Sequence, residues 1–278
     1  GGSGLYSLLG DARSVDVYTP FGAPAEPVAV GELGGVRVAF LPRHGVGHRF
    51  APHRVNYRAN LWALHTVGVR EVLAPCAVGS LDPARGPGTL VVPDQIIDRT
   101  WGRAHTYYER ESEVVHVGFA DPYCPRGRTA ALTAANAQRP HAHAHAPRPD
   151  TDTVDTPGIV DGGTLVVING PRFSTRAEAA WHRAAGGTIV GMTTMPEAVL
   201  ARELSMCFTT LALVTDLDAG LEAEGGVTHA GVFDVFAEHM GTVRATVAGA
   251  VARLAASDLP SCTCSATLDG IDVPFRAP

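Results

Sequence analysis

Two carboxylates separated by one residue, Asp216 and Asp218, follow directly after a long apolar run of this sequence. A carboxylate accepts hydrogen bonds from amino groups, and a protonated one can donate to a leaving group. An ordinary Asp is ionised at neutral pH, so a donating role needs a hydrogen-bonded or desolvating pocket. A pair of metal ligands or a polar turn after a strand is the alternative explanation of this spacing.

Arg43 and His44 follow another apolar stretch and could bind an anion. A planar guanidinium matches two oxygens of one phosphate group. The opening run Gly1-Gly2-Ser3-Gly4 would let the backbone approach an anion closely, with the Ser3 hydroxyl as a donor. Solvated surface and an ordinary glycine turn are the alternatives. A nucleophilic role for Cys76 is disfavoured, because we see no dedicated His partner for it.

The composition excludes several classes of partner. The formal net charge of the 278 residues is -6 and the chain has no Lys. No stretch has the basic density that nucleic-acid binding needs, so we expect no nucleic-acid partner. A bound phosphate must be held by Arg, hydroxyls and backbone N–H groups.

The cysteines and the apolar runs indicate a cellular setting. Five cysteines in so long a chain are too few for a secreted disulfide framework, so we expect a reduced, cytoplasmic protein. Cys262 and Cys264 are then expected to be free thiols, with a strained redox pair as the alternative. No apolar run is long enough to span a bilayer and no leader segment is evident, so we expect no membrane partner.

Alternating strands and helices predict an α/β fold. Period-two alternation predicts a strand over 36–41, and short apolar runs predict buried strands over 71–78, 164–168, 188–192 and 207–215. Helices are expected over 56–67, 174–185, 196–205 and 232–255. This order predicts one domain, with a mixed sheet covered on both faces and ligands beyond the carboxyl ends of its strands.

A segment rich in Pro and His, over about 137–157, departs from this pattern. Pro, Asp and Thr cannot bury enough apolar area to order it, so we expect a disordered surface insertion. Metal binding by its alternating His residues is the alternative.

Several motifs, in order along the chain, resemble those of the phosphate-dependent purine nucleoside phosphorylases of the trimeric type, and among them the methylthioadenosine phosphorylase branch. They are Leu41 to Gly45, Asn56 to Asn60, Gly79 to Leu81, Pro93 to Gln95, Ile97 to Thr100, Ala120 to Pro125, Gly170 to Arg176, Met192 to Glu197 and Asp216 to Asp218. Because the matches keep their order from residue 41 to residue 218, such agreement is not expected by chance.

The resemblance implies a single domain with a central mixed, partly barrel-like sheet flanked by helices, and a homotrimer with active sites shared between subunits. It also implies a strand before the opening glycines. The phosphate site would comprise Ser3, Arg43, His44, Cys76, Ala77 and Thr193. Cys76 is a departure, because relatives commonly place Ser or Thr there. The purine and ribose site would comprise His48, Phe173, Ser174, Met192, Asp216 and Asp218, with His116 reaching in from a neighbouring subunit.

The resemblance further implies phosphorolysis of 5'-methylthioadenosine to adenine and 5-methylthioribose-1-phosphate. Asp216 would donate to N7 of the base and Asp218 would accept from its exocyclic amino group, with phosphate as co-substrate and no metal or organic cofactor. Relatives that act on oxopurines usually carry Asn in place of Asp216 and Glu in place of Ser174, so both residues point to a 6-aminopurine and are assigned to catalysis.

Alternatives remain open at the substrate. Ala219-Gly220 replaces the Cys-Trp of familiar eukaryotic relatives, so adenosine or deoxyadenosine could be accepted. A phosphorylase for methylthioinosine or inosine, a hydrolase that uses water, and a catalytically idle nucleoside-binding protein are the other hypotheses.

Overall fold

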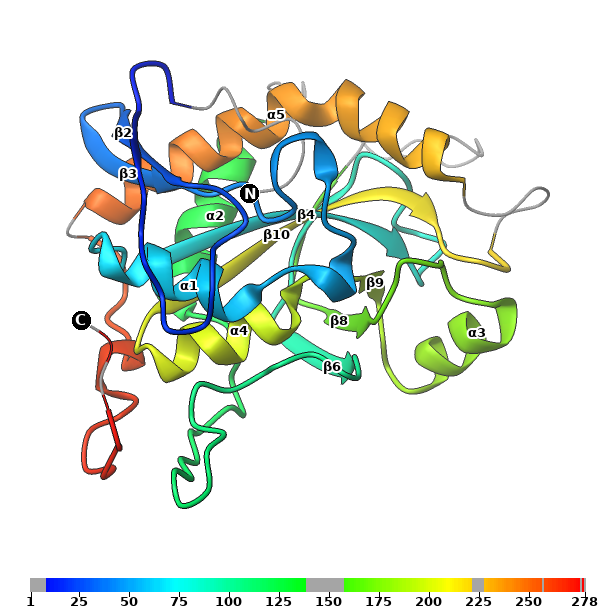
Figure 1. Cartoon of the computed structure of the whole chain (residues 1–278). Helices are drawn as coiled ribbons and strands as arrows, with labels where there is room; N and C mark the ends of the chain where they lie inside the picture. The colour runs from blue at the N-terminus through cyan, green and yellow to red at the C-terminus, as the bar shows by residue number, and fades with distance from the viewer. Residues whose placement is uncertain (1–8, 139–157, 222–227, 257, 276, 278) are drawn as a thin grey trace.

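A seven-stranded mixed sheet forms the centre of the fold (Figure 1). We describe a computed structural model over residues 9–138, 158–221, 228–256, 258–275 and 277. In spatial order the strands are β6 (Gln95–Arg99), β8 (Thr164–Ile168), β9 (Ile189–Gly191), β4 (Glu71–Ser80), β10 (Cys207–Leu217), β5 (Leu90–Val92) and β7 (Ile159–Asp161). The two long strands, β4 and β10, run parallel, whereas β9 and β5 are antiparallel to them. The predicted mixed sheet is therefore confirmed.

Helices cover both faces of this sheet, and β10 shows how. Successive side chains of a strand point to opposite faces. Leu211 and Leu213 pack in one buried cluster with residues of α2 (Pro125–Ala137) and α5 (His229–Ala255). Ala212 and Val214 pack in another with residues of α1 (Tyr57–Thr66) and α4 (Thr194–Glu203). Figure 1 shows these two pairs of helices on opposite sides of the strands.

Two of the shorter helices, α1 and α3, begin with side-chain caps. In α1 the side chain of Asn56 accepts a hydrogen bond from the backbone N–H of Ala59, which satisfies one free donor of the first turn. Helix α3 (Arg176–Ala184) begins with a capping box in which Thr175 and Glu178 each bind the other's backbone. This box fixes the chain direction just after Ser174.

A second, three-stranded antiparallel sheet precedes the Arg43 turn and consists of β1 (Arg13–Val15), β2 (Val28–Leu33) and β3 (Val36–Phe40). Gly34 and Gly35 join β2 to β3 with φ of 60° and 80°, a backbone that glycine adopts without steric cost. The inward side chains of this sheet pack with Ala63 of α1, so the small sheet holds residue 43 beside the large one. The described residues also form the 3-10 turns η1 (Val46–His48), η2 (Pro52–Arg54) and η3 (Cys264–Ala266).

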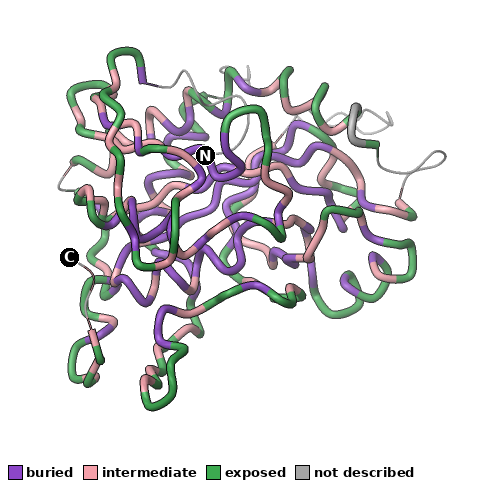
Figure 2. Tube along the Cα trace, in the orientation of Figure 1, coloured by how far each residue is buried: buried purple, intermediate pink, exposed green. Residues whose placement is uncertain are grey.

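The burial pattern follows this architecture. The buried trace runs through the central strands, while the β2–β3 turn and much of α3 are exposed (Figure 2). None of the described helices combines the length and apolar composition that crossing a membrane requires. The Gly1–Gly4 run and most of the predicted insertion, residues 139–157, lie outside the described residues.

Candidate functional site

A pocket of about 460 Å³ lies where β4, β8, β9 and β10 end. This is the edge of the sheet at which the sequence pattern predicts that ligands bind. The structure brings eleven of the thirteen predicted site residues to its wall: Arg43, His44, His48, Cys76, Ala77, Phe173, Ser174, Met192, Thr193, Asp216 and Asp218.

Arg43 is the buried cation of the pocket wall and forms an ion pair through Nε with Glu197 of α4, whereas Arg49 lines the pocket from a more exposed position. Burial lowers the pKa of Arg43, but the charge of Glu197 and its hydrogen bond more than offset this, so the pKa ends above its ordinary value. Among the described residues, the Arg43 side chain makes its hydrogen bond through Nε, so Nη1 and Nη2 remain available for anion oxygens. Sequence reasoning missed Glu197 as the partner, although it lies in a motif that carried the resemblance.

His44 is held as a neutral ring next to this cation. Its Nδ1 lies 2.8 Å from the carbonyl oxygen of Phe50, to which it donates. Burial, followed by the charge of Arg43, lowers the pKa of His44 to about 3. The ring stacks on His48, with centroids 4.1 Å apart and planes 12° from parallel. With Nδ1 protonated, the other nitrogen of His44 is an acceptor for a hydroxyl such as that of a protonated phosphate.

Thr193 and Cys76 complete this end of the pocket. Thr193 is the N-cap residue of α4, and its side chain makes no capping hydrogen bond. Burial raises the pKa of the Cys76 thiol to about 12, which the nearby Arg43 does not reverse. A thiol with a raised pKa is neutral at physiological pH, which argues against a thiolate nucleophile at Cys76.

Asp216 lies at an irregularity of the sheet. The pairing of β10 with β4 shifts between Val214 and Asp216, so Thr215 is an extra residue in the strand. Thr215 Oγ1 lies 2.8 Å from Asp216 Oδ1 and can donate to it. On the partner strand, a Cβ at Gly79 would lie 2.9 Å from Asp216 Oδ2. The bulge and this glycine together position the carboxylate.

Asp218 and Ser174 form a buried polar pair at the same end. Asp218 is 2% exposed and Ser174 9% exposed. Asp218 Oδ2 and Ser174 Oγ have no well-formed hydrogen bond within the described part of the chain, although both residues line the pocket. Burial raises the pKa of Asp218, while the Ala219 amide and the Ser174 hydroxyl oppose this. Buried polar atoms without partners are costly, so these two are suited to a polar ligand.

The polar residues around Arg43 and the polar residues around Asp216 lie beside different positions of β4. Cys76 is close to Arg43, whereas Gly79 is close to Asp216. Three residues of extended strand separate them by about 10 Å. The wall between them includes Met192 and Phe173, and also Val232, Phe233 and Phe236 at the start of α5. These three residues were not predicted to belong to the site. The available signal was their apolar side chains near the start of a predicted helix.

Two predicted residues are not at this wall. Ser3 lies outside the described residues. His116 is exposed and is not among the pocket-lining residues of its own chain, so its predicted contribution from a neighbouring subunit stays a prediction.

Comparisons with known proteins agree with this site. The family model of the phosphorylase superfamily matches residues 2–256. The chain is 53% identical to the purine nucleoside phosphorylase of Streptomyces coelicolor, over 100% of this chain and 96% of that protein. It is 51% identical to the S-methyl-5'-thioadenosine phosphorylase of Mycolicibacterium smegmatis, over 100% and 98%. A crystal structure of a methylthioadenosine phosphorylase from an Antarctic soil metagenomic library has a TM-score of 0.84 and 40% identity, over 96% of this chain and 88% of that one.

The α/β fold and the pocket at its strand ends are thus those of the phosphorylase superfamily, to which the chain belongs. Within that superfamily it is a pentosyltransferase of the purine nucleoside phosphorylase family, the family that includes the methylthioadenosine phosphorylases. The resemblance drawn from the sequence motifs is confirmed.

Proposed function

We propose that this protein cleaves 5'-methylthioadenosine with inorganic phosphate, giving adenine and 5-methylthioribose-1-phosphate, in purine and methionine salvage. The observation that carries the proposal is a buried pair of polar atoms, Asp218 Oδ2 and Ser174 Oγ, beside Asp216 at the pocket wall. Within the described part of the chain neither atom has a well-formed hydrogen bond. The names of the M. smegmatis relative and of the metagenomic structure support the same substrate.

The base end of the pocket fits a 6-aminopurine. An ionised carboxylate accepts from the exocyclic amino group of adenine, but repels the carbonyl oxygen of hypoxanthine. A site that hydrogen-bonds one edge leaves its buried groups unpaired with the other, which discriminates strongly. We assign Asp218 and Ser174 to this edge and Asp216 to N7, with Phe173, Met192 and His48 against the ribose and base.

The phosphate end fits an oxyanion. We assign phosphate binding to Arg43, His44, Thr193, the backbone of Cys76 and Ala77, and Ser3. Arg43 supplies a full positive charge, and the Thr193 hydroxyl is a donor that no helix cap occupies. No metal or organic cofactor is part of the proposal, since these groups supply the positive charge.

The reaction then follows from the placement of the two ends. A phosphate oxygen forms the bond to the anomeric carbon while the glycosidic C–N bond breaks, and the bonding electrons leave with the base. Asp216 donates or shares a proton at N7, which stabilises the departing purine. Catalysis comes from positioning and electrostatics rather than from a covalent enzyme intermediate.

The second candidate function is a phosphorylase for other purine nucleosides: adenosine, deoxyadenosine, methylthioinosine or inosine. The name of the S. coelicolor relative favours it, as does Ala219-Gly220 in the segment after Asp218. A homotrimer with His116 acting across the subunit boundary and a cytoplasmic location are also part of the proposal.

The deciding experiment is base release from methylthioadenosine, methylthioinosine, adenosine and inosine, each with and without phosphate. We expect phosphate-dependent cleavage with methylthioadenosine as the best substrate. Preference for an oxopurine would reject the assignment of Asp216 and Asp218 to the base edge. Cleavage without phosphate would indicate a hydrolase, and no turnover at all would indicate a binding protein.

A further inference from the structure

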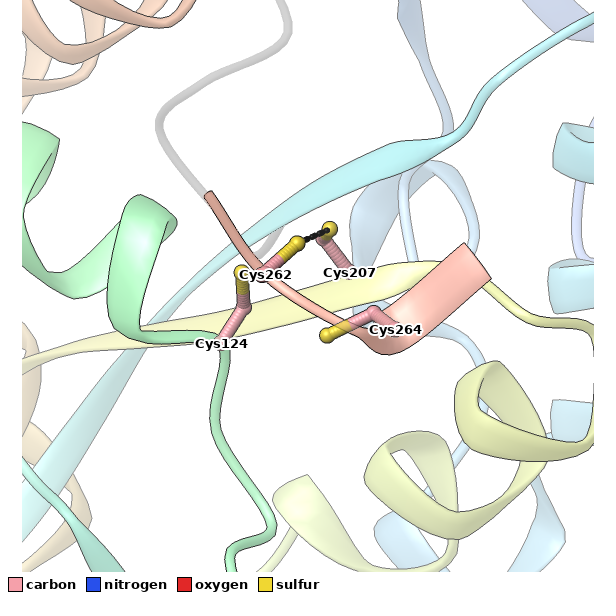
Figure 3. A group of neighbouring side chains, drawn as sticks. All are labelled: Cys124, Cys207, Cys262 and Cys264. Atoms are coloured by element: carbon pink, nitrogen blue, oxygen red, sulfur yellow. Dashed lines mark hydrogen bonds between the residues drawn. The ribbon is translucent and has the colours of Figure 1, made fainter. Parts of the chain in front are cut away.

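Four of the five cysteines meet at one place, far from the pocket (Figure 3). The Sγ atoms of Cys124, Cys207, Cys262 and Cys264 all lie within 4.8 Å of one another. The Sγ atoms of Cys207 and Cys262 are 3.5 Å apart. We call these four residues the cysteine cluster.

The cluster joins three segments that are distant in sequence. Cys124 is the N-cap of α2, Cys207 is the first residue of β10, and Cys262 and Cys264 belong to the C-terminal segment around η3. Cys207 and Asp216 lie near opposite ends of one extended strand, about 30 Å apart. The cluster is therefore separate from the nucleoside site, and its chemistry is not used in the reaction proposed above.

The arrangement suits one tetrahedral ion. With Zn–S bonds of about 2.3 Å, the sulfurs of a tetrahedral tetrathiolate lie about 3.8 Å apart. Separations of up to 4.8 Å need each sulfur to move inward by less than about 1 Å. Two disulfides would require each sulfur to be close to one partner, whereas here each sulfur is close to all three others. Four thiolates in tetrahedral geometry select zinc or iron, and zinc needs no redox partner.

The surroundings also favour bound thiolates. Cys124 and Cys264 are buried and the other two are half-buried, which is typical of a closed structural site. The guanidinium of Arg126 interacts electrostatically with Cys207 and Cys262, and is oriented by hydrogen bonds to Glu71 at 2.8 Å and to the carbonyl of Leu254 at 2.6 Å. Because Arg126 is also ion-paired with Glu71, only part of its charge offsets the negative charge of a tetrathiolate.

We propose that the cysteine cluster binds one Zn²⁺ as a structural site. Each thiol loses its proton as its sulfur binds the ion, so the complex carries a net charge of −2 and no oxidant or reductant is involved. From the sequence, Cys262 and Cys264 were expected to be free thiols, and no metal site was predicted. The structure changes that interpretation because it adds Cys124 and Cys207, which no short spacing connects to them.

The consequence of zinc binding lies in the C-terminal segment. The regular structure of residues 258–275 is limited to η3, so the segment depends on side-chain contacts. Its Phe275 packs against Tyr108, with ring centroids 5.0 Å apart, and against Trp62, at 6.0 Å. An ion bound by Cys262 and Cys264 together with the cysteines of α2 and β10 holds the C-terminal segment against the core.

The test is the metal content of the full chain, purified from zinc-replete cells in the presence of a phosphine reductant. We expect one zinc per chain in the wild type and in Cys76→Ser, which removes the cysteine outside the cluster. In Cys262→Ser/Cys264→Ser the zinc content should fall to background, and the Tm should fall with it. Cobalt exchanged into the wild type should give the intense charge-transfer and d–d bands of a tetrahedral tetrathiolate, a readout that needs no variant.

Four outcomes would overturn the proposal. Wild-type protein without zinc under these conditions would do so, as would iron in place of zinc. Full zinc content in the double variant would place the ion elsewhere. Disulfides among the four cysteines, found by peptide mapping of protein kept in its native state, would replace a metal site with a covalent one.

Discussion

The carboxylate of Glu197 forms an ion pair with Arg43 Nε inside the protein, and both side chains are nearly inaccessible to water. This contact joins α4 to the turn after β3, two segments 154 residues apart in sequence. Arg43 is thereby fixed through one nitrogen, while its other two can bind an anion. Glu197, which does not itself line the pocket, therefore positions Arg43 at the phosphate end.

Replacement of Glu197 by Gln should weaken phosphate binding. A charge-assisted hydrogen bond is worth about 1.5–3 kcal/mol, so we expect the KM for phosphate to rise at least about tenfold, with a smaller effect on the KM for the nucleoside. Loss of the partner of a buried charge should also lower stability by about 3–5 kcal/mol. Steady-state kinetics and chemical denaturation measure the two effects.

The matched control is Asp258→Asn, which removes an exposed ion pair with Arg253 at 3.0 Å. Surface pairs contribute about 0–1 kcal/mol, so this variant should resemble the wild type. An equal rise in both KM values for Glu197→Gln would argue against a specific role at the phosphate end.

Replacement of Asp216 by Asn should remove the proton donor. General acid catalysis contributes about 10²–10⁴-fold, so kcat on methylthioadenosine should fall by that factor with little change in the KM for phosphate. Exposed Asp11, changed to Asn, controls for the loss of one charge. Near-normal turnover by Asp216→Asn would remove Asp216 from the mechanism.

A single methyl group at Gly79 should displace the same carboxylate. The new Cβ would lie 2.9 Å from Asp216 Oδ2 and 3.3 Å from Val190 Cγ1. We expect kcat of Gly79→Ala to fall at least about tenfold, since an ångström of misplacement is costly in a reacting geometry. Gly86→Ala, whose Cβ has nothing within 4 Å, should keep full activity. Equal activity of the two variants would show that the Asp216 side chain moves without consequence.

The buried neutral ring of His44 predicts how stability depends on pH. Its pKa is about 3 in the folded protein and about 6.5 when exposed, so the unfolded state takes up a proton first as the pH falls. His44 therefore lowers stability progressively from pH 6.5 down to pH 3, by up to about 1.4 kcal/mol per pH unit. In phosphate-free buffer, His44→Gln should lose less stability than the wild type between pH 7 and pH 5. Identical slopes in urea titrations would contradict this assignment.

The oligomeric state decides whether His116 belongs to the site. We expect a trimer by analytical ultracentrifugation, and a rise of several-fold in the nucleoside KM of His116→Ala. Exposed His53, which does not line the pocket, offers a histidine control in the form His53→Ala. Full activity of a monomer would exclude a contribution across subunits.

Much of this fold could be predicted from local sequence patterns. The strands at 36–41, 71–78 and 164–168 and the helix at 56–67 are confirmed within two residues at each end, because their periodicity and caps are local properties. Strands β1, β5 and β7 have three residues each, too few for a period to show. Their existence depends on neighbours in the sheet.

The site was predictable where motifs carry it, and not where distant residues act in pairs. The roles of Arg43 and Asp216 could be predicted because their residue types supply a guanidinium and a carboxylate. The pairing of Arg43 with Glu197, and the meeting of Cys124 with Cys264, depend on the tertiary fold. The role of Gly79 depends on the space around it, which no spacing in sequence reveals.

The extra residue in β10 shows that the sheet is not built for stability alone. Up to Val214, the side chains of β10 pack alternately against the helices on the two faces of the sheet. Beyond the bulge, Asp216 and Asp218 both line the pocket. Deleting Thr215 would restore regular pairing but would also remove the hydroxyl that hydrogen-bonds the Asp216 carboxylate. Selection for a sturdier sheet and selection for turnover therefore act in opposite directions at this one position, and engineering for heat resistance should leave it alone.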